Sequence, residues 1–175
     1  GNEVCDDGVL VGCLGDCSGP RANFTCTPGS SSSPSVCSCN AGFHVSGSVC
    51  LPTCGDGLVV GDEVCDDTAQ GGCLSDCSAA HSNYTCPSGS PSSPSVCSCK
   101  TGFSGASCNP VCGDGKLVGN EVCDDTNSGG CTANCLAVNS NYTCSGGSPT
   151  TASVCSCLPG FYKTGMLCLP ICGDG

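Results

Sequence analysis

Cysteine constrains the fold of this chain more than any other residue, because it supplies 24 of the 175 positions. This share lies well above the roughly 8–10% that marks a disulfide scaffold. Trp is absent and aromatic residues make up 4% of the chain, so little apolar volume is left for a core. We therefore expect disulfides to replace core packing, each contributing about 2–4 kcal/mol.

This use of cysteine predicts an oxidising location, either outside the cell or on its surface. No apolar run in the sequence approaches the roughly 18 residues of a membrane span. The formal net charge is −11 and only 4 residues are Lys or Arg. Nucleic acid is therefore excluded as a partner, because binding a phosphate backbone requires basic side chains.

Three sequence motifs recur along the chain in the same order: EVCDD at Glu3, Glu63 and Glu121, SVCSC at Ser35, Ser95 and Ser153, and CGDG at Cys54, Cys112 and Cys172. The repeats predict three units, residues 1–60, 61–118 and 119–175, which we call repeats 1, 2 and 3. All three periods are cut at the same phase, and no unit has the altered sequence of a capping repeat. We therefore expect a window of a longer array.

The fold class predicted is a small disulfide-rich tandem array of three units of about 58–60 residues. No apolar period of 3.6 residues survives between the glycines and prolines, so we expect no helix. Short β-hairpins are expected around SVCSC and the Gly-Phe pairs, where β-branched and aromatic residues cluster. Phe43, Phe103 and Phe161 are expected to form a small apolar plug in each repeat, within a minimal hydrophobic core.

The closing segment of each repeat, for example CSCKTGFSGASC from Cys97 to Cys108, resembles the second half of an EGF-like module. The EGF-like pattern implies a disulfide that closes this hairpin in every repeat, and two further disulfides in the first half of repeat 1. Two cysteines remain over, and the resemblance then implies disulfides that join neighbouring repeats. The implied pairs are Cys39–Cys50, Cys99–Cys108, Cys157–Cys168, Cys13–Cys26, Cys17–Cys37, Cys54–Cys65 and Cys112–Cys123. From the residues alone, connectivity in the first half of each repeat stays open.

The rest of each repeat, for example CGDGKLVGNEVCDDTNSGGCTANC from Cys112 to Cys135, resembles the myxobacterial-type cysteine-rich repeat. That family occurs in long extracellular proteins of bacteria, ciliates and algae. The resemblance implies a surface repeat and no defined activity. Its partners would be neighbouring copies of the same repeat, joined head to tail.

The sequon N-x-T occurs once in each repeat, at Asn23, Asn83 and Asn141, and predicts N-glycosylation in a secreted protein. The alternative is that Asn only favours a turn there. The Ser, Thr and Pro loops that follow have the composition of O-glycosylated stretches, although a plain flexible loop would have it too. The candidate O-glycosylation sites are Thr27, Ser30, Ser31, Ser32, Ser33, Ser88, Ser90, Ser92, Ser93, Ser148, Thr150 and Thr151.

The acidic residues cluster around CGDG and EVCDD, where they form a candidate calcium site, since Ca²⁺ takes six to eight oxygen ligands. The alternatives are a solvated acidic face, or Asp side chains that cap turns by bonding the backbone. The spacing of Cys13 and Cys17 would suit zinc, but we expect these thiols to be oxidised. The candidate calcium ligands are Asp56, Glu63, Asp66, Asp67, Asp114, Glu121, Asp124 and Asp125.

No catalytic constellation recurs, and the two histidines, His44 and His81, occupy different places in their repeats. We therefore expect no enzymatic activity and no required cofactor apart from covalent glycans. The sequence predicts a structural repeat of an extracellular, glycosylated, disulfide-linked filament, such as a surface fibril, flagellar hair, cell-wall or matrix fibre. The alternative is a spacer or ligand-binding ectodomain of an adhesive or receptor protein.

Overall fold

The computed structural model describes residues 4–8, 11–30 and 32–173. Its internal contacts divide the chain into two compact units, Gly1–Ser98 and Cys99–Gly175. The boundary falls inside repeat 2, so compact units and sequence periods do not coincide. Each unit contains one complete junction between consecutive repeats, because residues 54–60 lie in the first unit and residues 112–118 in the second.

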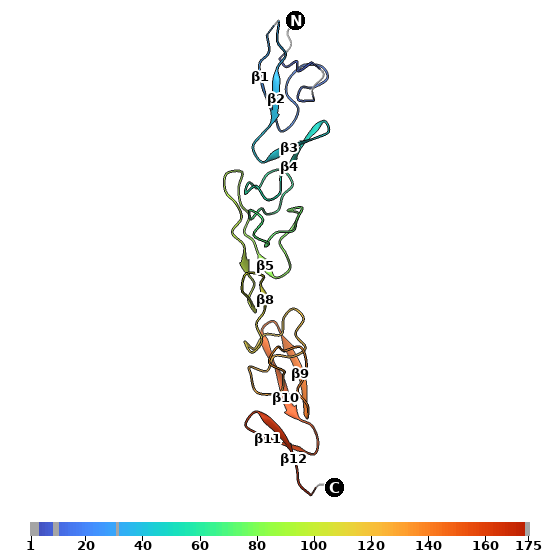
Figure 1. The fold of residues 1–175 in the computed structure, drawn as a ribbon, viewed down its shortest axis with the longest axis vertical. Coiled ribbons are helices and arrows are strands. Elements are labelled where there is room, and N and C mark those ends of the chain that lie inside the picture. The colour runs from blue at the N-terminus through green and yellow to red at the C-terminus, as the bar shows by residue number, and fades with distance from the viewer. Residues whose placement is uncertain (1–3, 9–10, 31, 174–175) are drawn as a thin grey trace. The chain divides into compact units, whose positions relative to one another are not determined.

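Short antiparallel hairpins and loops make up both units (Figure 1), and the described part of the chain has no helix, which confirms the predicted fold class. It consequently offers no long apolar helix of the kind that crosses a bilayer. The strands of the first unit and its boundary are β1 (Phe24–Thr27), β2 (Val36–Cys39), β3 (Phe43–Ser46), β4 (Val49–Pro52), β5 (Tyr84–Thr85) and β6 (Ser98–Cys99). Those of the second unit are β7 (Phe103–Ser104), β8 (Asn109–Pro110), β9 (Tyr142–Ser148), β10 (Thr151–Cys157), β11 (Phe161–Thr164) and β12 (Leu167–Pro170).

The first hairpin of a repeat brings the sequon segment against the SVCSC segment. In repeat 1, β1 pairs with β2 so that Cys26 faces Cys37. In repeat 3, the longer pair β9–β10 places Cys144 opposite Cys155 in the same register. Their Cα atoms are 4.0 Å and 4.1 Å apart, and both pairs are disulfides. Directly opposed residues in antiparallel strands approach this closely only at non-hydrogen-bonded positions.

The second hairpin of a repeat follows the Gly-Phe pair: β3–β4 in repeat 1, β7–β8 in repeat 2 and β11–β12 in repeat 3. In repeats 1 and 3 only two residues separate the strands, and the first of them, Gly47 or Gly165, has φ of 60° or 63°. Glycine adopts this left-handed conformation without steric cost. Repeat 2 has a shorter pair of two-residue strands.

Half-cystines dominate the buried side chains, and Phe24, Tyr142, Val60 and Val118 are the buried apolar residues of other types among those described. Phe43, Phe103 and Phe161, expected to form the plug of each repeat, are half-buried. The buried aromatic ring belongs instead to the start of the first hairpin, at Phe24 (8% exposed) and Tyr142 (7%). In the strand register Phe24 lies opposite the half-cystine Cys39, and Tyr142 lies opposite the half-cystine Cys157.

Disulfides join most of the described cysteines, both within the hairpins and in the turns and junctions between them. The hairpin disulfides Cys39–Cys50, Cys99–Cys108 and Cys157–Cys168 are the same pairs that the EGF-like resemblance implies. The implied pairs Cys13–Cys26 and Cys17–Cys37 are corrected: Cys13 is bonded to Cys5, and Cys26 to Cys37. The physical reason is the β1–β2 register, which puts Cys26 directly across from Cys37.

The implied disulfides between repeats are corrected as well. Cys54 and Cys112 are bonded to Cys77 and Cys135, and not to Cys65 and Cys123. Cys65 is bonded to Cys73, and Cys123 to Cys131, each across one turn.

Candidate functional site

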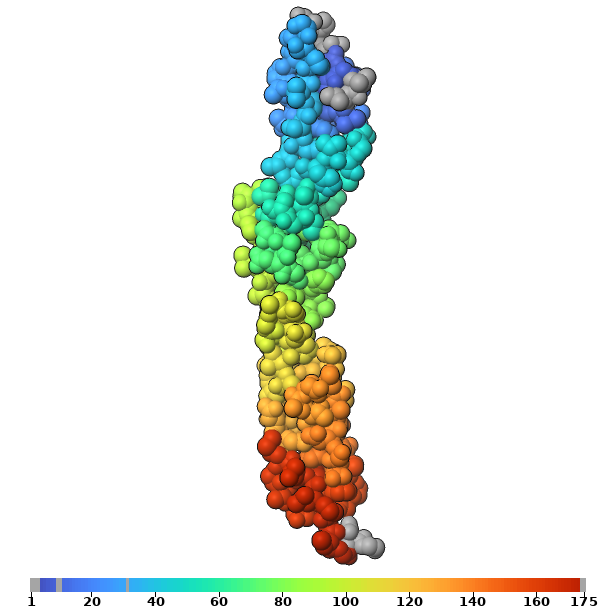
Figure 2. All heavy atoms as spheres, in the orientation of Figure 1, coloured from blue at the N-terminus to red at the C-terminus, as the bar shows by residue number. Residues whose placement is uncertain are grey.

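The site that the repeated motifs build is the junction between one repeat and the next. We call residues 54–60 and 112–118 the junction segments, because each begins with CGDG and connects the second hairpin of one repeat to the EVCDD motif of the next. In the space-filling view the hairpin β3–β4 and the junction segment after it, in cyan to teal, are in direct contact (Figure 2).

The first aspartate of the CDD motif holds the junction segment through its carboxylate. Asp66 is 0% exposed, and its Oδ2 accepts the backbone amides of Gly55 at 2.6 Å and Asp56 at 3.1 Å. Its Oδ1 accepts the amide of Thr68 at 2.9 Å. Hydrogen bonds to an ionised acceptor are roughly twice as strong as neutral ones. One side chain therefore binds a segment about ten residues upstream and its own turn at the same time.

The second junction contains the same arrangement. Asp124 is 0% exposed, and its Oδ2 accepts the amides of Gly113 at 2.7 Å and Asp114 at 3.1 Å. Its Oδ1 accepts the amides of Gly115 at 3.1 Å and Thr126 at 2.9 Å. Gly113 and Gly115 have φ of 89° and 78°. Alternating backbone conformations of this kind turn successive amides toward one point and form a concave anion site.

The second aspartate of the motif closes a tight turn. Asp67 is 3% exposed, and its Oδ2 and Oδ1 accept the amides of Gly72 at 2.6 Å and Gln70 at 3.2 Å. This turn brings Cys73 back to Cys65, with their Cα atoms 6.1 Å apart. A carboxylate-closed turn is therefore the physical reason why Cys65 bonds to Cys73 and leaves Cys54 to another partner.

A buried serine ties the same aspartate to the first hairpin of the repeat. Ser95 is 3% exposed; its amide donates to the carbonyl of Asp66 at 2.6 Å, and its Oγ accepts the amides of Asp66 at 3.2 Å and Gly89 at 3.0 Å. Ser153 and Asp124 form the equivalent pair at 2.6 Å and 3.1 Å. Sequence analysis did not identify this serine as a site residue. The sequence feature that could have identified it is its recurrence as the first residue of the SVCSC motif in every repeat.

The junction is also covalent. The disulfide Cys54–Cys77 joins the first residue of the junction segment to the second cysteine of the GGCxxxC motif, across 23 positions. Cys112–Cys135 repeats this bond with the same separation. Because each carboxylate binds the amides that directly follow the bonded cysteine, the disulfide and the hydrogen bonds hold one short stretch of backbone together.

An apolar contact seats the second hairpin on the junction segment. A Cβ at Gly42 would lie 2.9 Å from the Val60 side chain, and one at Gly61 would lie 2.7 Å from Pro52. The following junction repeats this packing between Gly102 and Val118, and between Gly119 and Pro110. Val60 and Val118 are 9% and 8% exposed. The Gly of the Gly-Phe pair is thus needed because any side chain there would displace the buried valine.

Glu63 and Glu121 close the end of each junction segment. Their Oε2 atoms accept the amides of Val60 at 3.0 Å and Val118 at 2.9 Å. Among the described residues no donor reaches their buried Oε1 atoms. Burial raises the pKa of both carboxyls above the ordinary 4.5, and the negative charges of neighbouring aspartates act in the same direction, against the lowering effect of the amide bond.

The acidic residues proposed as calcium ligands thus lie at the junctions, and most of their oxygens accept backbone amides. A cation at Asp66 would have to compete with amide dipoles that already point at both carboxylate oxygens. Asp56, which is exposed, accepts the amide of Leu58 at 2.9 Å. Asp114 accepts the amide of Lys116 at 2.9 Å and forms an ion pair with its ammonium group at 3.3 Å. The geometry is that of Asp-capped turns.

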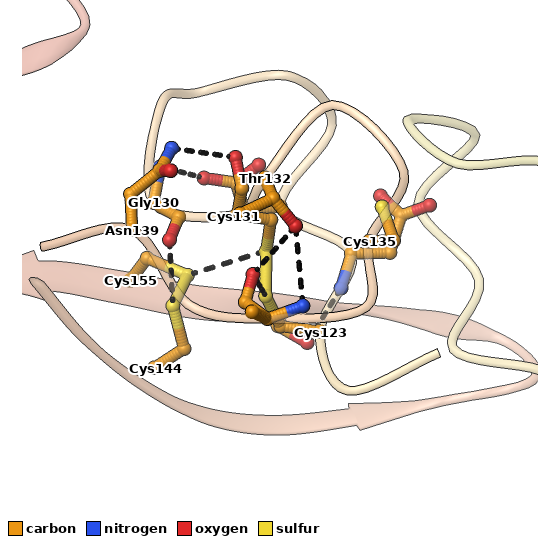
Figure 3. The surroundings of a disulfide bond; sticks show 12 residues. Cys123, Gly130, Cys131, Thr132, Cys135, Asn139, Cys144 and Cys155 are labelled. Atoms are coloured by element: carbon orange, nitrogen blue, oxygen red, sulfur yellow. Dashed lines mark hydrogen bonds between the residues drawn. A yellow bond between two sulfur atoms is a disulfide. The ribbon is translucent and has the colours of Figure 1, made fainter. Parts of the chain in front are cut away.

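Half-cystine sulfurs supply most of the clusters with metal-site dimensions, for example Cys123, Cys131, Cys144 and Cys155, and two further clusters add a carboxylate oxygen of Glu63 or Asp67. Figure 3 shows that the four-cysteine cluster is two neighbouring disulfides, with Cys131 and Cys155 sulfurs 4.0 Å apart. A disulfide sulfur is not the thiolate that a metal requires. A Cβ at Gly130 would lie 2.2 Å from Cys155 Cβ, so the GGC glycine lets the backbone pass against the disulfide.

The sequon asparagines precede the first hairpin of each repeat. Asn23 is exposed, and Asn83 and Asn141 are half-buried. Asn23 and Asn141 have φ of 64° and 67°, a conformation that Asn tolerates better than most residues. The threonines two positions later, Thr25, Thr85 and Thr143, are all exposed. The Asn141 side-chain amide donates to the carbonyl of Cys168 at 3.4 Å.

The Ser, Thr and Pro loops lie at the tips of the first hairpins. Ser31 lies outside the described residues. Ser90 and Ser148 are half-buried, and their carbonyls accept the amides of Val59 at 3.1 Å and Leu117 at 2.9 Å. The other candidate O-glycosylation residues are exposed: Thr27, Ser30, Ser32, Ser33, Ser88, Ser92, Ser93, Thr150 and Thr151.

Residues 36–78 match a family model described as a domain of unknown function, DUF4215. The match runs from β2 through the hairpin β3–β4 and the first junction segment to Ser78, and so includes the Cys54–Cys77 disulfide. No curated protein matches the chain. The match and the disulfides fit a cysteine-rich repeat, and disulfide bonding on this scale is typical of extracellular proteins.

Proposed function

We propose that the chain is a structural repeat of an extracellular, glycosylated, disulfide-linked filament, in which neighbouring repeats are joined head to tail. The observation that carries the proposal is the junction, which is built twice from the same residues. In both copies a buried aspartate and a disulfide hold the junction segment against the repeat that follows it, and a buried valine packs it against the second hairpin of the repeat before it. A fibre under tension needs such a connection at every repeat, because it breaks at the least stable connection along its length.

N-glycosylation at Asn23, Asn83 and Asn141 is part of the proposal. It is supported by one sequon per repeat and by the exposure of the threonine hydroxyl that completes each sequon. The exposed hairpin tips support O-glycosylation in the same way. Sugars there would cover hairpin edges that otherwise expose unpaired backbone groups to another strand. The role we propose for the chain is mechanical and not catalytic.

Electron microscopy of protein purified from its natural source tests the proposal. We expect long, unbranched filaments, and density for sugars beside Asn23, Asn83 and Asn141. Peptide mass spectrometry before and after enzymatic deglycosylation gives an independent measure of occupancy. Single short rods with no lateral or end-to-end assembly would favour the spacer or ectodomain role instead. Bare asparagines in native filaments would remove the glycan part of the proposal and leave the structural part standing.

A further inference from the structure

The carboxylate of Glu63 lies beside the disulfide that closes the first junction. One of its oxygens and the sulfurs of Cys54 and Cys77 all lie within 4.8 Å of one another. Its Oε2 accepts the amide of Val60 at 3.0 Å, whereas its Oε1 is buried and is reached by no donor among the described residues. No ion pair joins Glu63 to a described Lys, Arg or His. The disulfide is therefore flanked by a negative charge that no basic side chain neutralises.

The two sulfurs of this disulfide differ in accessibility. Cys77 is 1% exposed, whereas Cys54 reaches the protein surface. A thiolate breaks a disulfide by bonding to one sulfur and expelling the other as a thiolate. An attacking thiol can therefore reach Cys54, and Cys77 must leave as an anion from a buried position next to the Glu63 carboxylate.

Negative charge beside the disulfide opposes both parts of this reaction. It repels the incoming thiolate, and it disfavours the departing Cys77 thiolate, since like charges repel. Both effects are larger at a partly buried site than in bulk water, because a lower effective dielectric constant strengthens charge–charge interactions. The effect requires the charge of the side chain and not only its oxygen atoms.

The second junction has the same parts. Glu121 Oε2 accepts the amide of Val118 at 2.9 Å, and no described donor reaches its buried Oε1. The junction disulfide again joins an accessible sulfur to a buried one, since Cys112 is half-buried and Cys135 is 1% exposed. The glutamate of EVCDD thus keeps one oxygen without a donor in both described junctions, whereas both aspartates of the motif bind backbone amides through both oxygens.

We propose that Glu63 and Glu121 protect the junction disulfides from reduction by small thiols. In the step that Glu63 slows, a low-molecular-weight thiolate bonds to the sulfur of Cys54, the Cys54–Cys77 bond breaks, and its electron pair leaves with Cys77 as a thiolate. A second thiolate then attacks the mixed disulfide and releases Cys54, so two small thiols are oxidised to one disulfide. The inference goes beyond the proposed function, because it applies to the junction whether or not the repeats form filaments.

Partial reduction of the oxidised full chain tests the proposal. The protein is treated with mercaptoethanol at about pH 8, where a thiol of pKa about 8.5 is partly ionised, and samples are alkylated at intervals, digested and analysed by mass spectrometry. Glu63→Gln should speed alkylation of Cys54 and Cys77 about fivefold or more, because Gln keeps an oxygen acceptor for the Val60 amide but carries no charge. Equal rates in Glu63→Gln and the unmodified chain would overturn the proposal.

Two controls separate the charge from a loosened junction. Asp62→Asn removes one charge from an exposed neighbour and should change the rate by less than about twofold, because exposed charges are screened. Native-state hydrogen exchange at the amides of Gly55 and Asp56 should be equal in Glu63→Gln and the unmodified chain. Faster reduction together with lost protection at these amides would assign the effect to an opened junction and overturn the proposal.

The second junction supplies an internal comparison. In Glu63→Gln the Cys112–Cys135 disulfide keeps its own glutamate, so its rate of reduction should stay unchanged. Glu121→Gln should reverse the pattern and speed reduction of Cys112–Cys135 alone. Acceleration of both disulfides by either single variant would contradict a local effect of charge and overturn the proposal.

The charge of the small thiol gives an independent readout. Cysteamine carries an ammonium group beside its thiolate and mercaptoacetate carries a carboxylate, so a negative site favours reaction with cysteamine. The ratio of the two rates at Cys54–Cys77 should fall in Glu63→Gln and stay the same in Asp62→Asn. A ratio that Glu63→Gln leaves unchanged would overturn the proposal.

The outcome is separable from that of the proposed function. Native filaments whose junction disulfides are reduced equally fast with and without the Glu63 charge would overturn the protection alone. Faster reduction of Glu63→Gln, with no filaments in native material, would overturn the filament and leave the protection intact.

Discussion

At the scale of single residues, the two aspartates of CDD act as hydrogen-bond acceptors inside a protein that has almost no oily core. An ionised carboxylate is costly to bury unless donors surround it. Asp66 and Asp124 meet this condition with backbone amides alone. A carboxylate accepts several amides that converge from different directions. For this reason one buried Asp holds the junction segment in place here, a role that several apolar side chains would fill in a larger domain.

Replacing the buried carboxylate should loosen the junction. For Asp66→Asn we expect a loss of about 1.5–3 kcal/mol, the range for hydrogen bonds to charged groups, because the side-chain NH₂ would face amide donors. Native-state hydrogen exchange at Gly55 and Asp56 measures the loss. Asp76→Asn is the matched control, since Asp76 is exposed and bonds only locally to Ser78. Equal protection in both variants would contradict the role of Asp66.

The junction glutamates should make stability depend on pH. Burial raises the folded-state pKa of Glu63 above 4.5, so the folded protein binds protons more tightly than the unfolded chain. Stability should therefore fall as pH rises from about 4.5 through the folded-state pKa, and Glu63→Gln should remove this part of the decrease. Carboxyl NMR titration checks the direction. Asp76 is the internal comparison, because the Ser78 hydroxyl lowers its pKa below 3.8. A Glu63 midpoint below 4.5 would refute the burial argument.

At the scale of elements, the second hairpin of a repeat is as much a part of the following junction as of its own repeat. The amide of Thr53, just after β4, donates to the carbonyl of Gly42 at 2.8 Å, and Val60 packs against the same glycine. The family match at residues 36–78 covers this hairpin together with the junction segment. The hairpin, the junction segment and the CDD turn thus form one packed element, although the sequence period assigns them to two repeats.

Shortening the buried valine should detach the hairpin. Val60→Ala should cost about 1–2 kcal/mol, since it removes buried methyl groups and leaves a cavity. Hydrogen exchange at the Thr53 amide reports on the contact. Val64→Ala is the matched control, because Val64 is 53% exposed, and it should change stability by less than about 0.5 kcal/mol. If the two variants behaved alike, the hairpin would not depend on Val60.

The disulfide pairing of the junction can be read chemically. Digestion without reduction, followed by mass spectrometry, should yield peptides linked through Cys54–Cys77 and Cys65–Cys73. Replacing both Cys54 and Cys77 with Ser should destabilise the junction by about 3 kcal/mol, the value for a loop of this length. The Asp66 hydrogen bonds should persist at reduced protection. Recovery of a Cys54–Cys65 peptide from the native protein would return the pairing to the one that the EGF-like resemblance implies.

At the scale of the whole molecule, stability depends on sulfur more than on buried apolar area. The described residues leave many aliphatic side chains exposed, for example Val36 at 68%, Val96 at 77% and Val154 at 72%. Net stabilities of domains are only about 5–15 kcal/mol, and the loss of one native disulfide from a small domain costs about 2–5 kcal/mol. Reduction of all the disulfides therefore removes more stabilising free energy than the net free energy of unfolding of such a fold.

Complete reduction should unfold both units. We expect the amide NMR spectrum to lose its dispersion when the protein is reduced and alkylated without denaturant, whereas the oxidised protein in the same buffer keeps it. The effect should not depend on protein concentration, because the disulfides lie within the chain. A dispersed spectrum after complete alkylation would show that hydrogen bonds and packing suffice without the disulfides.

Much of this architecture follows from residues read in order. Cysteine content, scarce aromatics and the recurring motifs predict a disulfide-rich array of short hairpins, because no other source of stability is available to such a chain. The hairpin at the Gly-Phe pair is predictable from the β-branched and aromatic residues that cluster there, and the EGF-like resemblance implies the disulfide that closes it. The sequence also shows that the acidic residues cluster at the junctions, but it does not show that their carboxylates accept backbone amides.

Tertiary structure decided which cysteines meet and what the carboxylates bind. Strand register sets Cys26 against Cys37, and the turn closed by Asp67 brings Cys73 to Cys65; neither distance can be read from spacing. Asp66 and Gly55 are 11 positions apart, yet the backbone of the junction segment points its amides at that carboxylate. Local sequence determines turns and hairpins because these involve neighbours. Long-range partners depend on how several turns fold together, and only their combined geometry specifies them.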